Sequence, residues 1–446
     1  MELFKQRQMK NRLLGSLLMS LISMTVMGQV SRTLSPYSQF GLGVLADQSQ
    51  SFGRGMAGLS IGVRNGKYVN VQNPASYSSV DSLTMIFDIG LSGQITNFKE
   101  GGKKLNAKTA AFDYAVAAFR VLPKLGASLG VIPYSNIGYS YETIGWIGEA
   151  GGDAYGSAAN NQYTIGYDGK GGFSQAFLGL GWEIAKGFSI GTNISYFWGK
   201  YEKSAGYKSN DSYQNTVART YTTNINSWKL DFGAQYSTPV NKDDVLTVGA
   251  TFGIGHKLGA DANLEILNTN TQTLVTRTSR DSVANAFKLP FTFGVGVSLL
   301  HKNSLTVGVD YLLQKWGSID YPQVNAETSR YQAFSGVLKD RHKVTIGADW
   351  IPNASARSFL KRVHYRLGAS YATPYYNIGT LNGPKELCVS AGFGIPIVNT
   401  WNNRSALNIS AQWVHSSARD LVTENTFRIN IGLTFNERWF AKWKVD

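Results

Sequence analysis

The sequence predicts an all-β fold: a transmembrane antiparallel β-barrel of about fourteen strands with an N-terminal plug, or hatch, in its lumen. The first observation is strict alternation, as in the segment TFRINIGLTF near the C-terminus. There Phe427, Ile429 and Ile431 alternate with Arg428 and Asn430, which gives an extended strand one apolar and one polar face. The second observation is the composition, and the third is a regular succession of short and long connections.

Glycine and aromatic residues are abundant, and charged residues are scarce. The chain holds 48 glycines, 23 tyrosines and 22 phenylalanines, and 16% of its residues are charged, whereas soluble domains average about 25%. Barrel walls use glycine, and aromatic residues collect at both membrane interfaces. The net charge is +14, but the basic residues form no run or stripe. We therefore expect outer-membrane lipid and lipopolysaccharide as neighbours, and no nucleic-acid partner.

Residues 1–28 are predicted to be a secretory signal peptide. Four basic residues precede the apolar run LLGSLLMSLISMTVM, and Gly28 follows it; a basic start, an apolar stretch and a small final residue are typical of export signals. No later stretch reaches the roughly 18 apolar residues of a membrane-spanning helix. An exported chain of this kind is either soluble or a barrel, because only helices and closed barrels cross lipid.

Residues 81–446 are predicted to form the barrel. The alternating segments are 83–97, 109–121, 125–139, 173–184, 187–201, 225–238, 244–257, 287–300, 303–315, 341–351, 362–374, 385–397, 405–415 and 425–436. Even-numbered connections are mostly short, such as LPK and AK, whereas the long odd-numbered ones are 140–172, 202–224, 258–286 and 316–340. Outer-membrane barrels have short periplasmic turns and long outer loops, so we expect the outer membrane of a Gram-negative bacterium.

Residues 29–80 do not alternate for long and are rich in glycine. A barrel of fourteen strands has a lumen wider than side chains alone fill. We therefore predict that this segment is the plug.

No catalytic constellation is found, and we predict a protein that is not an enzyme and has no cofactor and no metal. GRGMAG at 53–58 lacks the βαβ context of a dinucleotide site. Matches to G-x-S-x-G at 58–62 and 126–130 lack the strand-turn-helix bend of a nucleophile elbow. The five histidines share no metal-ligand spacing.

The motif QNPASY places Asn73, Pro74 and Ala75 at the end of the predicted plug. Asn-Pro alone favours a turn. Together with the glycine-rich stretch before it and the fourteen strands after it, the motif resembles the outer-membrane long-chain fatty-acid transporter family, the FadL and toluene-channel type. The resemblance implies a hatch that ends in Asn-Pro-Ala.

Pro133 interrupts the third predicted strand, and proline in a strand marks an edge or a bulge. The resemblance implies that an inward kink at this strand opens a lateral gap in the wall. It also implies that Asn73, Pro74 and Ala75 lie against the kink and form a gate with Pro133.

Apolar side chains are predicted on the inward register, where a porin would have polar ones: Ile132, Phe177, Phe197 and Leu312. They either contact the plug and folded-in loops or form an apolar ligand pocket. The inward cations Lys229, Lys343, Arg366 and Arg428 are candidates to hold a ligand carboxylate.

The resemblance implies passive uptake of small hydrophobic molecules such as long-chain fatty acids, with lateral release at the third strand. The alternative is a barrel of the same fold that acts in protein export or surface attachment. Its protein partner would contact the outer loops, such as 140–172 and 258–286.

Overall fold

The computed structural model describes residues 35–82, 84–147, 161–325, 327–397 and 405–437. The predicted signal peptide, residues 1–28, lies outside these ranges.

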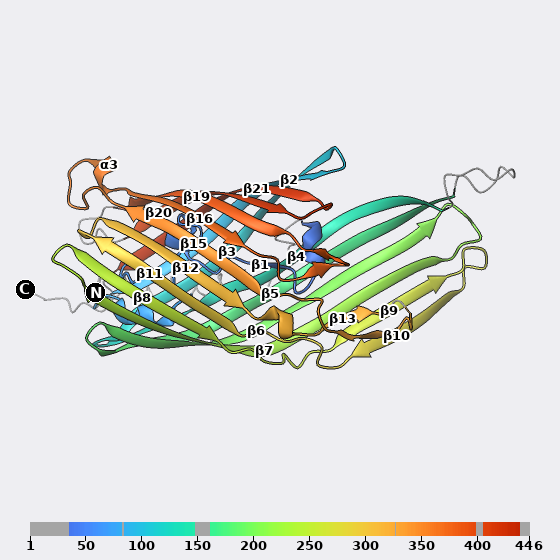
Figure 1. The fold of residues 1–446 in the computed structure, drawn as a ribbon, viewed down its shortest axis with the longest axis horizontal. Coiled ribbons are helices and arrows are strands. Elements are labelled where there is room, and N and C mark those ends of the chain that lie inside the picture. The colour runs from blue at the N-terminus through green and yellow to red at the C-terminus, as the bar shows by residue number, and fades with distance from the viewer. Residues whose placement is uncertain (1–34, 83, 148–160, 326, 398–404, 438–446) are drawn as a thin grey trace, which may run out of the picture.

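A closed ring of fourteen antiparallel strands forms the fold, which confirms the predicted number (Figure 1). β2 pairs with β21, with Met85 opposite Glu437, and this pairing closes the ring. Each predicted segment corresponds to one strand of the ring. In chain order the strands are β2 (Met85–Glu100), β3 (Lys103–Leu122), β4 (Leu125–Ile147), β5 (Asn161–Ala185), β6 (Phe188–Ser209), β7 (Thr216–Pro239), β8 (Asp244–Gly253), β11 (Thr292–His301), β12 (Leu305–Gln314), β15 (Arg341–Trp350), β16 (His364–Ala372), β19 (Lys385–Pro396), β20 (Ala406–Ser417) and β21 (Thr423–Glu437).

Smaller elements precede and connect these strands. Before the ring come η1 (Pro36–Gln39), β1 (Val44–Leu45), α2 (Ser51–Arg54) and η2 (Pro74–Ser79). The connections hold β9 (Ala262–Thr269), β10 (Thr276–Val283), η3 (Trp316–Ser318), β13 (Tyr321–Val324), β14 (Tyr331–Phe334), α3 (Phe359–Arg362), β17 (Asn377–Ile378) and β18 (Leu381–Asn382).

The two faces of the ring have the predicted polarity. Ile431 is 49% exposed on the outer face, whereas its neighbour Asn430 is 4% exposed on the inner face. We call the exposed outward apolar side chains the apolar belt. It includes Leu91, Leu178, Ile194, Val295, Val309, Ile346, Leu367, Val389 and Ile431.

The prediction of long loops at 140–172 and 202–224 is wrong, because strands extend through most of the described residues there. β4 runs to Ile147 and β5 begins at Asn161, so the described part of 140–172 is strand. Likewise β6 and β7 take up most of 202–224. These extensions contain glycine, tyrosine and polar residues on both faces, so apolar alternation ends although backbone pairing continues. The region 258–286 contains the hairpin β9–β10, whose first strand pairs with β7.

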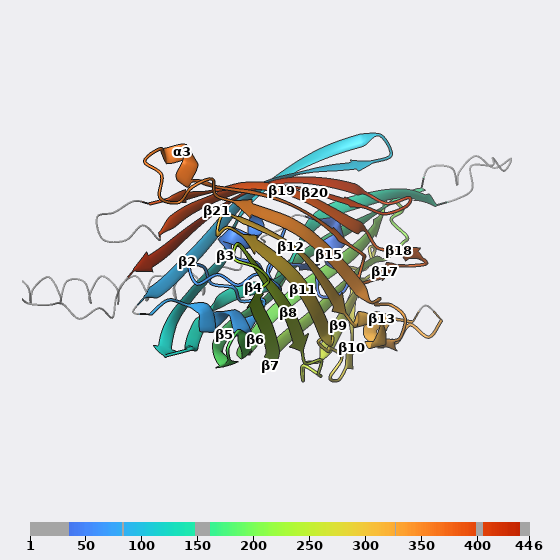
Figure 2. The same cartoon turned by 60° about the vertical axis from the view of Figure 1, so that its left-hand side comes forward.

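Residues 35–80, the N-terminal segment, are mostly buried and contact the inner face of the ring (Figure 2). Their hydrogen-bond partners lie on strands from all around the ring, including β2, β4, β5, β6, β7, β11, β12, β16, β19, β20 and β21. Among these partners are Asp88, Gly138, Asn193, Ala234, Asp310, Ser390, Gln412 and Asn430.

Glycines let this segment approach the wall closely. A Cβ at Gly249 would lie 2.0 Å from the carbonyl oxygen of Ile61, and one at Gly191 would lie 2.4 Å from the carbonyl carbon of Pro74. No other residue leaves room for a backbone at these positions. Within the described residues, no helix has the length and apolarity needed to cross a membrane.

Candidate functional site: a cavity beside a break in strand pairing

Strand pairing between β3 and β4 covers only part of their length. It runs from Leu122 opposite Leu125 to Ala115 opposite Val131 and then stops. Beyond that point, residues 103–114 of β3 pair only with β2, and residues 132–147 of β4 pair with β5. We call this interruption the β3–β4 break. In Figure 1 the hairpin of β2 and β3 diverges from β4.

A bulge lies on each strand where the two separate. On β4 the register with β5 shifts between Pro133 and Ser135, and Pro133 has no N–H to give to a ladder. On β3, Gly90 and Leu91 of β2 lie opposite Tyr114 and Phe112, so Asp113 is the extra residue. Bulges bend and twist strands, so both favour the separation. The structure therefore has a strand irregularity at Pro133, as the sequence predicts.

The N-terminal segment occupies part of the free edge of β4. In β1, Val44 and Leu45 pair with Asn136 and Ser135. The Gln48 side chain donates a hydrogen bond of 2.7 Å to the carbonyl oxygen of Pro133. Within the described residues, the backbone of β3 residues 103–114 pairs with β2 alone. At the break, the N-terminal segment therefore covers part of the β4 edge, whereas the described residues leave the β3 edge uncovered.

A cavity of about 200 Å³ lies beside the β3–β4 break. Ala111, Phe112 and Asp113 of β3 line it, together with Pro133 and Tyr134 of β4. Charged side chains of both signs complete the lining: Asp47, Asp113, Asp310, Glu386, Glu424, Arg54, Arg341, Lys343 and Arg428. The lining is therefore mixed, because apolar residues such as Val44, Leu45, Ile61 and Leu312 also border the cavity.

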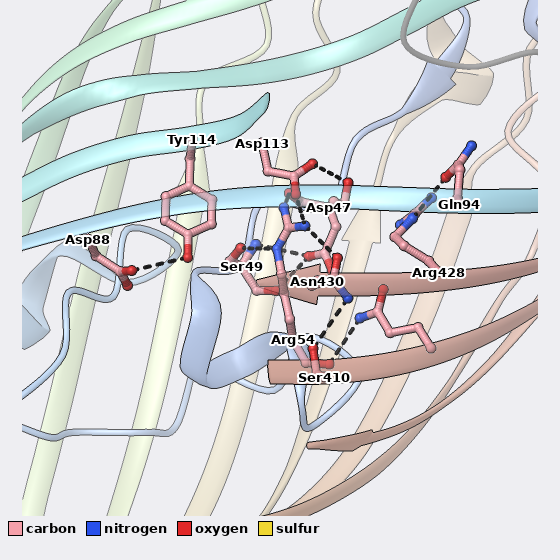
Figure 3. Close-up of polar contacts among 12 residues, drawn as sticks. Asp47, Ser49, Arg54, Asp88, Gln94, Asp113, Tyr114, Ser410, Arg428 and Asn430 are labelled. Atoms are coloured by element: carbon pink, nitrogen blue, oxygen red, sulfur yellow. Dashed lines mark hydrogen bonds and ion pairs between the residues drawn. The ribbon is translucent and has the colours of Figure 1, made fainter. Parts of the chain in front are cut away.

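Arg54 of α2 connects the N-terminal segment to the break (Figure 3). Its guanidinium lies 2.7 Å from an Asp113 carboxylate oxygen and donates to the Asn430 side chain at 2.9 Å. The second oxygen of Asp113 accepts a hydrogen bond of 3.0 Å from Ser92. Because Asp113 is the bulged residue of β3, this ion pair attaches the N-terminal segment to the place where β3 leaves β4.

Asp47 is a second charge on the N-terminal segment at the cavity. Its carboxylate accepts hydrogen bonds from the backbone N–H and hydroxyl of Ser49, at 2.9 and 2.7 Å. Burial disfavours the charged form, but Arg54, Lys343 and the Ser49 hydrogen bonds outweigh it and hold the pKa of Asp47 below its ordinary value. The cavity is therefore lined by an ionised carboxylate beside two cations.

Two of the four predicted ligand-binding cations line the cavity. Lys343 and Arg428 do so, and Arg428 donates from Nε to Gln94 at 2.9 Å. Neither forms an ion pair with another described residue. The other two do not border the cavity: Lys229 pairs with Asp231, and Arg366 is held by other groups of the wall and the N-terminal segment. These are Asp349 at 3.1 Å, Asn408 at 2.6 Å and Tyr68 at 3.1 Å.

The predicted apolar pocket does not form. Ile132 and Phe177 are buried in a cluster with Tyr77 of the N-terminal segment, and Phe197 packs in a cluster that contains Leu42 and Tyr134. Contact with the N-terminal segment and the connections, the other interpretation of the sequence, therefore accounts for all three. Of the four predicted apolar residues, Leu312 borders the cavity.

Asn73, Pro74 and Ala75 lie away from Pro133, against the prediction. Asn73 is 0% exposed and its side chain donates to the carbonyl oxygens of Ile61 at 2.9 Å and Ala234 at 3.2 Å. Its Oδ1 accepts from the Ala75 N–H at 3.2 Å and so caps η2. Gln48 takes the expected place beside Pro133.

Sequence reasoning missed Gln48, Asp47, Arg54 and Asp113. Only Asp113 carried a signal, as an acidic residue inside the apolar segment 109–121. The other three lie in the non-alternating region, where periodicity gives no direction for a side chain.

The fold and the cavity define a fourteen-stranded β-barrel with a partly unpaired wall, a buried N-terminal segment and a charged cavity at the break. The BamG family matches residues 9–446, and the chain belongs to this family. No curated protein matches the chain.

Solved structures of the predicted type share the fold. The Pseudomonas aeruginosa FadL homologue matches with a TM-score of 0.60 and 10% identity, over 89% of this chain and 99% of that chain. The Ralstonia pickettii toluene transporter TbuX matches with a TM-score of 0.58 and 14% identity, over 87% and 98%. The P. putida toluene transporter TodX matches with a TM-score of 0.57 and 12% identity, over 89% and 100%. The predicted resemblance is thus confirmed for the fold, whereas the family itself is BamG, which is a distinct one.

Proposed function

We propose that this protein is an outer-membrane channel for small hydrophobic or amphipathic molecules, which leave the lumen sideways at the β3–β4 break. The observation that carries the proposal is the position of the cavity: side chains of both unpaired strands line it. The apolar belt favours a lipid surrounding, since lipid-facing residues of a barrel are apolar. The transport described in the names of TbuX and TodX is consistent with such a channel.

In this proposal the N-terminal segment is the plug, and residues 44–48 with Pro133 are the gate. The cavity of about 200 Å³ is smaller than the roughly 300–1,000 Å³ of sites that enclose a drug-sized ligand. A longer molecule therefore needs residues 44–48 to move from the β4 edge. Asn73, Pro74 and Ala75 act as the anchor of the plug on β5–β8 rather than as part of the gate.

Long-chain fatty acids remain the proposed default cargo. Lys343 and Arg428 line the cavity, and Lys343 already interacts electrostatically with Asp47 and Asp310. They are the cations we propose for a carboxylate head group. The acyl chain would then extend toward Leu312 and Phe112 at the break.

Neighbouring alanines of β3 provide the test. Ala111 lines the cavity, whereas Ala110 is exposed on the outer face of the same strand. Ala111→Trp should block uptake of a labelled fatty acid in whole cells, and Ala110→Trp should not. Barrel folding, checked by heat-modifiable migration on gels, should be normal in both variants. Uptake at the normal rate in the Ala111→Trp variant would refute the lateral route.

A protein partner is the second candidate function. The long strands β4–β7 and the hairpin β9–β10 extend at the end opposite the short turns, and residues 276–282 of β10 are exposed. If a protein partner binds this surface, the main role of the barrel would be in protein export or surface attachment rather than in transport of small molecules. If Ala111→Trp has no effect and a protein co-purifies with the barrel unless β9–β10 is deleted, this second function is favoured.

A further inference from the structure

The short turns at one end of the ring carry a strong excess of positive charge. These turns are residues 123–124, 186–187, 240–243, 302–304 and 351–363. They contain one acidic residue, Asp243, and seven basic residues: Lys124, Lys186, Lys242, Lys302, Arg357, Lys361 and Arg362. Each of these five turns has at least one of the basic residues.

The opposite end shows no such excess. Its described connections are 101–102, 210–215, 254–291, 315–325, 327–340, 373–384 and 418–422. They contain eight basic and eight acidic residues. Among the described connections, the excess of positive charge is therefore confined to the short turns.

The turn between β15 and β16, residues 351–363, combines this charge with exposed apolar side chains. In α3, Phe359 is 49% exposed and Leu360 is 66% exposed. Three of the basic residues lie in the same turn, which has no acidic residue. The Asn353 N–H donates to the Lys361 carbonyl oxygen at 2.8 Å, which closes the turn. Large exposed apolar side chains next to cations are typical of segments that lie in a membrane interface.

The α3 turn is continuous with the apolar belt. The Tyr365 hydroxyl donates to the Leu360 carbonyl oxygen at 3.1 Å. The Tyr365 ring lies 5.8 Å from the Trp350 ring and 5.8 Å from the Phe393 ring, and both of those residues are about half exposed on the outer face. Aromatic clusters at the rim of a barrel mark the level of lipid head groups. In Figure 1, α3 projects from the ring at this rim.

We propose that the α3 turn is a lipid-binding anchor: Phe359 and Leu360 insert into the leaflet at the short-turn end, and the basic rim binds anionic phospholipid head groups. The proposal rests on the membrane setting of the proposed function. Anionic head groups match the charge, and an acyl layer matches the exposed apolar pair, so one leaflet satisfies both. An acidic protein would satisfy the charge alone.

Site-specific fluorescence on the full chain tests the insertion. In a Cys388→Ser background, an environment-sensitive dye is attached at Ser358→Cys beside α3, at Val309→Cys in the apolar belt, or at Thr328→Cys on the opposite rim. The barrel is reconstituted in nanodiscs of phosphatidylcholine with or without phosphatidylglycerol. We expect brominated lipid to quench the dyes at 309 and 358 but not the dye at 328, and quenching at 358 to increase with phosphatidylglycerol.

The charge contribution has a matched control. Arg357→Gln, Lys361→Gln and Arg362→Gln are combined in one variant, and Arg277→Gln, Arg280→Gln and Arg330→Gln of the opposite rim in another. At about 1 kcal/mol for each basic residue near an anionic surface, the first variant should lose roughly fivefold in apparent affinity for phosphatidylglycerol per residue. The second variant should lose little.

Each failure has a separate meaning. Quenching at 309 but not at 358 would overturn the anchor and leave the membrane channel intact. No quenching at 309 would refute the membrane setting itself, and with it the proposed function. Equal affinity loss in the two glutamine variants would overturn the role of the basic rim.

Discussion

At the residue scale, the Arg54–Asp113 pair has the largest expected effect. Arg54 is 3% exposed, and its loss leaves the bulged Asp113 as an unpaired carboxylate at the cavity. Removal of one partner of a buried ion pair costs about 3–5 kcal/mol. We expect Arg54→Leu to lower the free energy of local opening of residues 49–57 by that amount. Amide hydrogen exchange in detergent measures this free energy.

Arg64 provides the control for this prediction. It pairs with Glu183 at 3.2 Å, and both side chains are more exposed than those of the Arg54–Asp113 pair, so Arg64→Leu should cost less than Arg54→Leu. Equal exchange in the two variants would show that the Arg54–Asp113 pair does not hold the N-terminal segment.

Asp47 predicts a dependence on acid. Its pKa lies below the ordinary value of 3.8, because Arg54, Lys343 and the Ser49 hydrogen bonds outweigh burial. A lowered pKa stabilises the folded state fully above the ordinary value, and this stabilisation is lost as the pH falls through the lowered value. Pepsin cleavage within residues 35–80 should therefore increase with acid in the wild type. In the Asp47→Asn variant this part of the pH dependence should be absent. If cleavage of the variant depends on pH as steeply as cleavage of the wild type, Asp47 is not the group responsible.

Residue roles were only partly predictable from the sequence. Alternation gave the inward direction of Lys343 and Arg428, and both line the cavity. It gave the same direction for Lys229 and Arg366, which are neutralised by Asp231 and Asp349. Period-2 alternation specifies a face but not the neighbours across strands that are distant in sequence.

At the element scale, the fit between the N-terminal segment and the glycine-lined wall holds this segment in place. A Cβ at Gly249 would overlap the carbonyl oxygen of Ile61, whereas one at Gly206 would meet nothing within 4 Å. Gly249→Val should therefore displace the segment at a cost of roughly 1–3 kcal/mol, and Gly206→Val should have little effect. Thermal unfolding in detergent, combined with limited proteolysis of residues 35–80, distinguishes the two variants. Similar proteolysis of both would mean that close backbone contact is not needed.

The sequence indicated a separate N-terminal element but not its position. Asn-Pro-Ala at 73–75 predicts a capped turn, and Asn73 does cap η2. The wall that η2 contacts depends on glycines of β4–β8, which come much later in the sequence. Local turn chemistry has no information about such long-range complementarity.

At the scale of the whole molecule, the apolar belt predicts how the wall tolerates charge. Ile346 is 52% exposed on the outer face, and the adjacent Thr345 borders the cavity. Ile346→Arg should destabilise the barrel in lipid by about 2–4 kcal/mol, and Thr345→Arg should cost less. Urea unfolding from vesicles measures both, and equal costs would contradict an outward belt. Inward Gly308 or Gly432 would be a poor control, because added side chains there would meet Leu59 or Ser51.

The number and order of the ring strands were predictable because each central stretch alternates between lipid-type and polar residues. Strand lengths were not, because β4–β7 continue past the apolar belt with polar residues on both faces. Backbone hydrogen bonds between adjacent strands hold these extensions together. Because such bonds do not depend on side-chain polarity, the hydropathy pattern does not reveal them.

The ring closure between β2 and β21 also determines the order of assembly. Met85 pairs with Glu437, so the first strand of the ring remains an open edge until the last one is available. The N-terminal segment depends on the same late strands, through Asn430 of β21 and Gln412 of β20. Contacts between such distant residues form slowly. The first strand of the ring to be synthesised therefore has one native neighbour, β3, at once and receives the other, β21, last. The contacts of the N-terminal segment with β20 and β21 can form only at that same late stage.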